Sequence, residues 1–189
     1  YSCKMKLLET AAQSHEIENI ISDSNDFLIL VSPYLKINNR LRPKLDSCFN
    51  RNNRNFILFR EKKLTLEDEK WFKSFPNLTL IPIKNLHAKC YLNEKTALIT
   101  SMNLYDYSQI NNHEIGIKIS LKENKNEIRQ ILSFIKTIVK TDFPEFDFSA
   151  IDSSQKNLTM GELYAELVNQ YIFPDKHNGI DSTYEYMCN

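Results

Sequence analysis

The chain has 189 residues, and its 24 basic and 24 acidic residues give a formal net charge of zero. This length suits one domain with a small appendage. No apolar run reaches the ~18–20 residues of a membrane-spanning helix, so stable membrane insertion is not expected. The three scattered glycines exclude a P-loop, a dinucleotide-binding fingerprint and a nucleophile elbow, all of which need clustered glycine.

The N-terminal third of the chain alternates helical and strand patterns. Apolar residues recur at helical spacing over residues 4–22, which predicts an amphipathic helix. The short apolar run 27–31 predicts a buried strand that ends at Ser32-Pro33. Residues 40–50 predict a helix with one apolar stripe and basic residues opposite, and the apolar run 56–59 predicts a second buried strand.

The central part of the chain continues this alternation. Residues 64–75 predict a helix with Thr65 as its N-cap. The following segments predict a third strand at 78–83, a hairpin of 87–93 and 96–101 that turns at Asn93-Glu94-Lys95, a strand at 114–120 with Ile115, Ile117 and Ile119 on one side, and a helix over 128–139.

Strands that alternate with helices predict an α/β fold. We expect a mixed, largely parallel sheet covered by helices on both faces, with ligand sites at the strand-to-helix junctions. Residues 1–141 form this domain. Residues 142–189 are predicted to be an acidic extension, with an irregular aromatic segment at 143–148 and one helix at 158–172 that packs on the domain.

The zero net charge conceals two charged segments of opposite sign. Residues 36–63 hold nine basic and two acidic residues, a net charge of +7, whereas residues 142–189 carry −7. The basic segment predicts a local anionic partner, although a solvated basic face explains the same charges. The opposed charges also raise the hypothesis that the acidic tail covers the basic segment in an inhibited state, while plain packing of helix 158–172 is favoured.

The cysteine pattern points to reduced thiols. Cys3, Cys48, Cys90 and Cys188 are scattered without a C-x-x-C pair, so they support neither a zinc site nor a disulfide framework. A cytoplasmic location is therefore the expectation. Because the chain starts at Tyr1 and not at methionine, a removed N-terminal signal stays open.

One group of polar residues has spacing that suits chemistry. His87 and Lys89 are two residues apart, so on a strand both side chains project from the same face. Ser101 and Asn103 have the same spacing at the end of the next strand and can converge on the same place. Glu114 opens the following strand, where it could accept a hydrogen bond from the imidazole and fix its tautomer.

This group suits phosphate chemistry. Lys89 would neutralise charge on phosphate oxygens, and Ser101 and Asn103 would donate hydrogen bonds to them. His87 would then attack phosphorus or donate a proton. Cys90 lies beside this group but points the other way by strand alternation, so it is interpreted as a core thiol and not as a nucleophile.

At these residues the sequence resembles the phospholipase D superfamily, whose signature is H-x-K, an acidic residue, G-S-x-N and a downstream N-x-E-x-G. The resemblance covers roughly residues 5–140 and includes the lead-in Leu30–Tyr34. Thr100 replaces the motif glycine, which puts the shape of the phosphate pocket in question. Glu94 replaces an aspartate, and its distance to Ser101 is one residue short. The matching segments are His87-Ala88-Lys89, Glu94, Thr100-Ser101-Met102-Asn103 and Asn112-His113-Glu114-Ile115-Gly116.

The resemblance implies a mechanism and an assembly. In this family two motifs meet at one site, where one histidine becomes a phosphohistidine and the other protonates the leaving oxygen. Only one H-x-K is present here, so the resemblance implies a homodimer with His87 and Lys89 from both copies across a two-fold axis. It also implies that no metal or other cofactor is needed.

Nucleic acid, either DNA or RNA, is the favoured substrate, and the expected activity is that of a metal-independent endonuclease. The alternatives are an enzyme that hydrolyses phospholipids or transfers a phosphatidyl group, and a non-catalytic nucleic-acid-binding dimer. No groove-reading motif is evident, so little sequence specificity is expected. The residues predicted to contact the substrate are Arg40, Arg42, Lys44, Arg51, Arg54 and the stacking candidate Tyr34.

Overall fold

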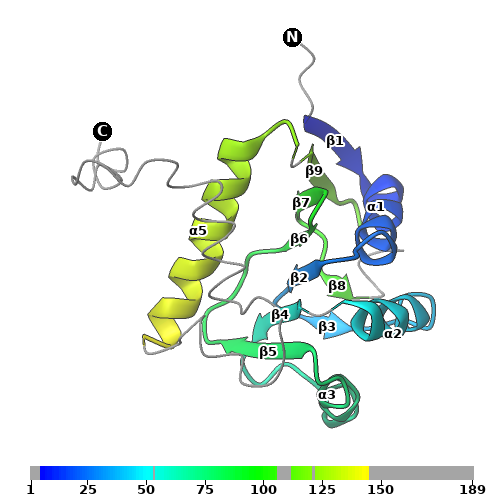
Figure 1. Ribbon diagram of the computed structural model, residues 1–189, viewed down its shortest axis with the longest axis vertical. Coiled ribbons are helices and arrows are strands. Elements are labelled where there is room, and N and C mark those ends of the chain that lie inside the picture. The colour runs from blue at the N-terminus through cyan, green and yellow to red at the C-terminus, as the bar shows by residue number, and fades with distance from the viewer. Residues whose placement is uncertain (1–4, 53, 106–111, 121, 145–189) are drawn as a thin grey trace. The chain divides into compact units, whose positions relative to one another are not determined.

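The structure, a computed structural model, describes residues 5–52, 54–105, 112–120 and 122–144. Within these residues, seven strands form one sheet in the order β1-β9-β7-β6-β2-β4-β5 (Figure 1). A short second sheet pairs β3 (Leu35–Lys36) with β8 (Leu104–Tyr105) in parallel. The strands of the main sheet are β1 (Met5–Glu9), β2 (Phe27–Val31), β4 (Arg54–Arg60), β5 (Leu78–Ile83), β6 (Cys90–Asn93), β7 (Thr96–Thr100) and β9 (Ile115–Ser120).

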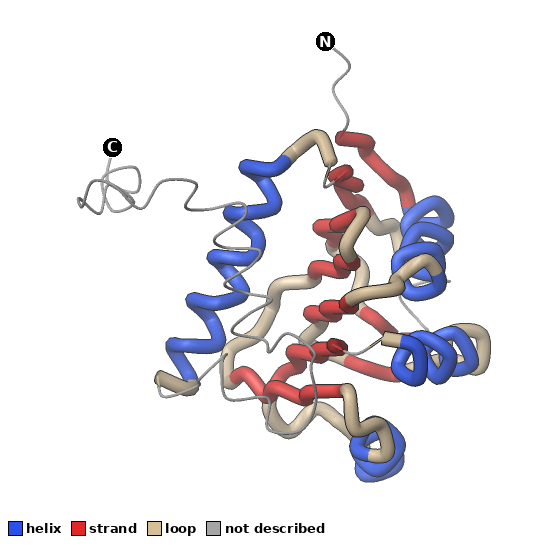
Figure 2. Tube along the Cα trace, viewed as in Figure 1, coloured by secondary structure: helices blue, strands red, loops and turns tan. Residues whose placement is uncertain are grey.

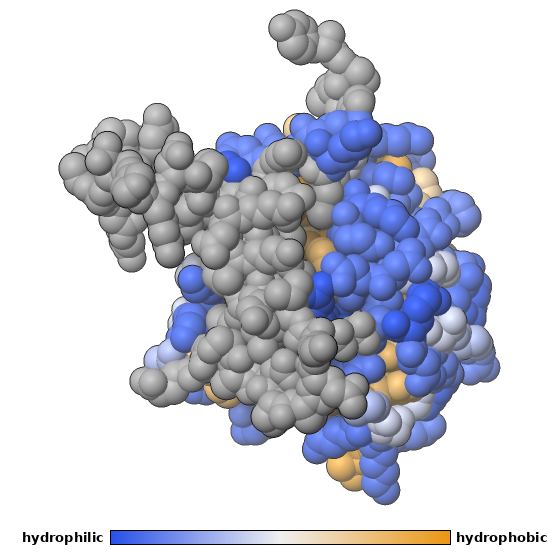
Figure 3. All heavy atoms as spheres, viewed as in Figure 1, coloured by the Kyte–Doolittle hydropathy of each residue, from blue (hydrophilic) through white to orange (hydrophobic). Residues whose placement is uncertain are grey.

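Helices cover both faces of the main sheet, which confirms the predicted α/β class. On one side lie α1 (Thr10–Ser22), α2 (Arg42–Arg51) and α3 (Leu66–Lys73), and on the other lies α5 (Lys125–Asp142) (Figure 2). The outer side of α1 and α2 is mainly hydrophilic (Figure 3), as expected for helices that bury one face against a sheet. Within the described residues, no helix combines the length and apolarity needed to cross a bilayer.

The sheet is mixed, but it is less parallel than expected. Strands β2, β4 and β5 run parallel, whereas β1–β9, β9–β7, β7–β6 and β6–β2 all pair antiparallel. The antiparallel half arises because the tight turn after β6 forces a hairpin, and β9 and β1 then add to its open edge. The expectation of a largely parallel sheet was therefore wrong.

Several elements agree with their sequence patterns. The strands predicted at 27–31 and 78–83 are β2 and β5 with those bounds. Thr65 caps α3, because its hydroxyl oxygen accepts a hydrogen bond from the Asp68 amide at 3.1 Å. The sequence was sufficient to predict these elements, because each strand is an apolar run with a clear break at both ends and the cap belongs to its own helix.

The N-terminal helix prediction was wrong for residues 5–9. These residues form β1, the edge strand that pairs with β9, and the helix begins only at Thr10. Leu8 is buried on the α1 side of the sheet, while Leu7 faces the other way and is exposed. The strand depends on a partner more than 100 residues later in the sequence, and local periodicity does not record such a partner.

The core lies on both sides of the sheet. Leu28, Leu30 and Tyr91 are fully buried beneath α1 and α2. On the other side Leu132 and Ile135 of α5 are buried. Of the predicted acidic extension, only residues 142–144 belong to the described part, so most of the aromatic segment 143–148 and the whole of helix 158–172 lie outside the described residues.

Candidate active site

The predicted catalytic residues lie around one edge of the main sheet. Val31, the last residue of β2, is the partner of Cys90, the first residue of β6. His87 and Lys89 come directly before β6, so they lie where the parallel strand β2 ends. The predicted strand began at His87, but the structure starts it at Cys90, and the Lys89 carbonyl still accepts a hydrogen bond from the Thr100 amide at 3.2 Å.

Ser101 and Glu114 meet at this edge. The Ser101 hydroxyl donates a short hydrogen bond to Oε2 of Glu114 and accepts one from the Ile115 amide at 3.0 Å. The side-chain amide of Asn112 donates to the other carboxylate oxygen of Glu114 at 3.1 Å. The expected hydrogen bond between Glu114 and His87 does not form, and the carboxylate instead accepts from Ser101 and Asn112. Within the described residues, the exposed His87 makes no hydrogen bond.

Lys89 lies in the field of Glu114. Partial burial lowers the pKa of Lys89, while the negative charge of Glu114, and that of Tyr34 when it ionises, act in the opposite direction. Tyr34 follows β2 and its side chain is 38% exposed. The ammonium, the carboxylate and this aromatic ring therefore belong to one cluster at the end of β2.

The loop that carries Ser101 and Asn103 is fixed from below. The Tyr91 hydroxyl donates to the Met102 carbonyl at 2.9 Å, and the Leu104 amide donates to the Ser32 hydroxyl at 3.0 Å. Asn103 itself has a buried side-chain oxygen without a hydrogen-bond partner among the described residues. This unpartnered oxygen, on a firmly held loop, can accept a hydrogen bond from a ligand.

Comparison with solved structures places this arrangement among known folds, whereas no family model and no curated protein matches the sequence. NucT from Helicobacter pylori has a TM-score of 0.62 at 13% identity, over 72% of this chain and 96% of that one. Nuc from Salmonella typhimurium, described as a phospholipase D family member, has a TM-score of 0.51 at 13% identity, over 61% and 82%. The chain has the phospholipase D fold.

A third neighbour with this fold is larger. The phosphatidylserine synthase of Haemophilus influenzae Rd KW20 has a TM-score of 0.56 at 13% identity, over 88% of this chain but only 44% of that protein. The resemblance noted from the motif residues is therefore confirmed at the level of the fold.

The structure explains the threonine that replaces the phospholipase D motif glycine. Thr100 is buried on the α1 side of the sheet, where its hydroxyl donates to Oε1 of Gln13 and accepts from the Met102 amide at 2.9 Å. Gln13, itself fully buried, also donates to the Leu8 carbonyl at 3.1 Å. Thr100 thus holds the loop to α1 from beneath.

The glycine of the downstream motif segment, Gly116, is required for a steric reason. Gly116 is the strand partner of Thr100, and a Cβ added to it would lie 2.6 Å from Oε1 of Gln13 and 3.0 Å from the Ile99 carbonyl oxygen. Gln13 therefore fits over the sheet only because residue 116 has no side chain. The strand that Glu114 precedes is held against α1 by this close approach.

This packing predicts a coupled effect of two substitutions. Gly116→Ala should lower the free energy of unfolding by about 1–3 kcal/mol, because the new methyl group overlaps Gln13. In the Gln13→Ala background the same change should cost about 1 kcal/mol less, because the clashing side chain is absent. Urea unfolding of the four proteins of this cycle measures the coupling, and strictly additive losses would show that Gln13 is not what Gly116 accommodates.

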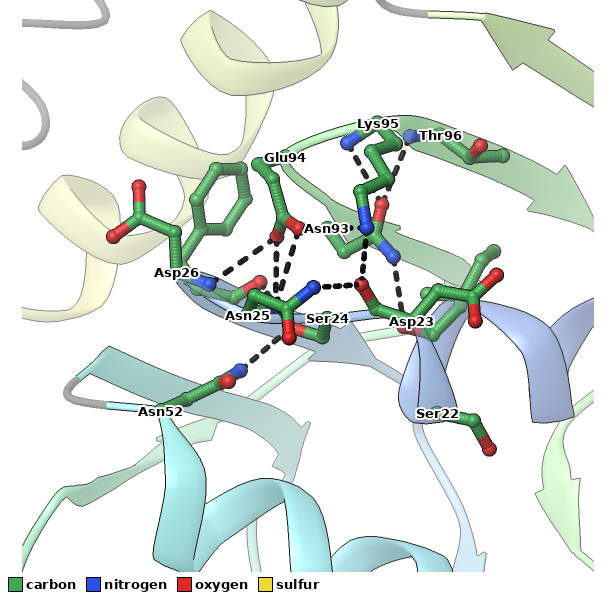
Figure 4. A network of polar contacts seen from close by, with 12 residues as sticks. Ser22, Asp23, Ser24, Asn25, Asp26, Asn52, Asn93, Glu94, Lys95 and Thr96 are labelled. Atoms are coloured by element: carbon green, nitrogen blue, oxygen red, sulfur yellow. Dashed lines mark hydrogen bonds and ion pairs between the residues drawn. The ribbon is translucent and has the colours of Figure 1, made fainter.

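The acidic motif residue Glu94 lies at the other end of the hairpin. Its carboxylate accepts hydrogen bonds from the amides of Asn25 and Asp26, at 3.1 Å for the shorter Asn25 contact (Figure 4). Lys95 donates to the Asp23 carbonyl at 2.7 Å in the same network. Glu94 therefore fixes the turn between α1 and β2, far along the strands from His87, and its role is to stabilise the fold.

The basic residues predicted to contact the substrate are not gathered at the edge of His87. Arg51 donates to the carbonyls of Ser22 and Ser24, and Arg54 pairs with Asp26, so both lie at the opposite edge of the sheet. The sequence could not reveal this, because their acceptors lie in a turn about 28 residues away.

The other three predicted basic residues are engaged between helices. Arg40 and Lys44 approach Glu18 of α1 at 2.8 and 3.7 Å, and the Arg42 guanidinium lies 4.2 Å from the centre of the Trp71 ring. Of the predicted substrate contacts, Tyr34 follows β2 and so lies at the same edge of the sheet as Lys89.

The Cys90 thiol does not suit a nucleophile. Cys90 is buried, and burial raises the pKa of its thiol to about 12, so it stays protonated at neutral pH. No group of three or more His, Cys, Asp or Glu side chains in the described part of the chain is arranged to hold a metal ion.

Proposed function

We propose that this protein is a metal-independent phosphodiesterase, and specifically an endonuclease that hydrolyses DNA or RNA through a phosphohistidine intermediate. The observation that carries the proposal is the cluster of Lys89, Ser101 and Glu114 at one edge of a phospholipase D fold, next to the exposed His87. Such a cluster holds an anion and offers a nucleophile.

The chemistry proceeds in two displacements at phosphorus. An imidazole nitrogen of His87 attacks and forms a P–N bond while the P–O bond to the leaving group breaks, and the leaving oxygen takes a proton from His87 of a second copy. Water then attacks the phosphohistidine, gives its proton to the second imidazole, and displaces His87. Lys89 and Asn103 stabilise the charge that builds on the phosphate oxygens, and Ser101 holds Glu114 beside Lys89.

The second copy has a suitable surface on which to dock. Leu7, Ile117 and Ile99 are partners across β1, β9 and β7, and their side chains are 62%, 42% and 45% exposed. They lie on the sheet face opposite Gln13 and α1, the face that α5 covers elsewhere (Figure 1). Ile115, 59% exposed, continues this surface to Glu114. We define Leu7, Ile99, Ile115 and Ile117 as the apolar row.

The apolar row supports the proposed homodimer. An uncovered apolar surface of this kind suits a protein interface, and its continuity with the candidate site favours a second copy as the occupant. Two copies that bury this row would bring two His87 residues into one assembly, as the single His-x-Lys pair requires.

Two alternatives remain, and a specific observation favours the first of them. The similarity in fold to a phosphatidylserine synthase favours a phosphatidyl-transferring or phospholipid-hydrolysing enzyme. A non-catalytic nucleic-acid-binding dimer would need the same fold and anion site without turnover. The intact cluster around Lys89 and Glu114 favours catalysis over the second alternative.

One panel of substrates separates these functions. The purified protein is incubated with EDTA and single-stranded DNA, duplex DNA, RNA or phosphatidylcholine vesicles, and the products are resolved. We expect cleavage of at least one nucleic acid and none of the lipid. Release of the lipid head group alone would establish the phospholipid alternative, and nucleic-acid binding without any cleavage would establish the binding dimer. Strict dependence on a divalent metal would overturn the mechanism.

A further inference from the structure

Two loops flank the candidate site at the end of the parallel strands. The β2–β4–β5 ladder continues past β2 and β4, because the Arg60 amide donates to the Pro33 carbonyl at 3.3 Å and the Glu61 amide donates to the Ile83 carbonyl at 3.0 Å. Tyr34 and the turn after β4 therefore lie at the same edge as His87.

The contacts run from this turn into the site. The Lys63 ammonium lies 5.9 Å from the centre of the Tyr34 ring, and Tyr34 follows β2, whose last residue Val31 is the strand partner of Cys90, next to Lys89. Lys89 interacts with Glu114, which Ser101 holds. An exposed aromatic ring with a cation beside it is thus directly connected to the phosphate-binding cluster.

The lysines of this turn differ from the basic residues of α2. Lys62 and Lys63 are exposed and form no ion pair with an acidic residue in the described ranges, whereas Arg40 and Lys44 lie on Glu18. Lys62 also adopts a φ of 62°, a left-handed conformation that glycine adopts at lower energy. The turn is net positive, because Lys62 and Lys63 each carry a positive charge and Glu61 carries a single negative charge.

We propose that Tyr34, Lys62 and Lys63 form the surface that delivers single-stranded nucleic acid to the site. A base stacks on the Tyr34 ring and the neighbouring phosphates lie against the two ammonium groups. Single strands suit this surface because their bases are free to stack on an aromatic ring, whereas duplex bases are stacked on one another. The inference rests on the proposed function and assigns its substrate contacts to the turn after β4 in place of α2.

The test measures binding apart from cleavage. Full 189-residue chains carrying His87→Ala are titrated with a fluorescent single-stranded oligonucleotide, and anisotropy gives the dissociation constant at several salt concentrations. Lys62→Gln with Lys63→Gln should weaken binding about tenfold and reduce the salt slope by about 1.4, the value for two lost phosphate contacts on a single strand. Tyr34→Leu should weaken it about tenfold, and Tyr34→Phe should leave it unchanged.

Matched variants make the result specific. Lys70→Gln with Lys73→Gln removes the same charge from α3 and should not alter binding, and Arg40→Gln with Lys44→Gln should weaken it less than the change in the turn. A larger effect of the α2 pair, equal effects of all three pairs, or equal effects of the two Tyr34 substitutions would each overturn the assignment. The same proteins are also titrated with phosphatidylserine vesicles. If the substitutions in the turn weaken binding to these vesicles, and no oligonucleotide is bound at all, the assignment is overturned in favour of a lipid. Because this experiment measures binding and not cleavage, its result can be interpreted even if the catalytic proposal fails.

Discussion

We expect His87→Ala to reduce phosphodiester cleavage by about 10³-fold or more and to leave the fold intact. The loss is this large because the substitution removes both the attacking nitrogen and, from the second copy, the proton donor. His87 is exposed and makes no hydrogen bond within the described residues, so its removal costs little stability. Initial rates with EDTA present, on the substrate identified by the panel, measure the loss.

The matched control is His15→Ala, which removes an exposed imidazole from α1 and should retain full activity. Equal activity of His87→Ala and the unaltered protein would eliminate the phosphohistidine mechanism. Quenching a reaction with a labelled substrate in alkaline detergent, where the P–N bond of a phosphohistidine is stable, should trap label on the protein, and this label should disappear in His87→Ala. A stable fold in the inactive variant, checked by urea unfolding, shows that the loss is chemical.

The pH dependence of activity should reflect the lowered pKa of Lys89. Burial lowers the pKa of Lys89, so as pH rises its ammonium loses its proton earlier than that of an exposed lysine. Activity that requires this charge is therefore lost as pH rises, and the loss occurs below the usual pH range for lysine. Lys89→Arg, whose charge persists, should move that fall to higher pH in whatever activity it retains.

The sequence predicted what depends on local pattern. Strands β2 and β5 were apparent because each is a short apolar run, and Thr65 was recognisable as a cap because it acts on its own helix. The error at residues 5–9 has the opposite cause, since β1 exists through β9.

The candidate site, like the fold, was predicted from the sequence only in part. The spacing of Ser101 and Glu114 relative to Lys89 suggested that these residues converge, and the structure brings them together. Charge density in residues 36–63 did not show which basic groups are available, because the residues that engage them, such as Glu18 and Trp71, come from other helices. Gln13 carried no signal at all, since its importance comes from the close approach of α1 to Gly116.

We expect Ile117→Asp to convert the proposed dimer to a monomer and to remove its activity. Ile117 is the middle residue of the apolar row, between Leu7 and Ile99. In the free chain an aspartate at this exposed position is solvated, so the monomer stays folded. In the dimer the carboxylate would be buried without a partner, at a cost of about 3 kcal/mol or more, which raises the dissociation constant more than 100-fold. Sedimentation velocity over a range of concentrations measures this change.

Activity must follow assembly if the site is shared. The monomer should lack turnover because each phosphate then meets one His87 only, and activity should return at concentrations that restore the dimer. Leu66→Asp places the same charge at another exposed leucine, 78% exposed on α3, and should change neither assembly nor activity. A fully active Ile117→Asp monomer would show that one copy completes the site. An unaltered protein that is monomeric at every concentration would show instead that residues of its own chain cover the apolar row.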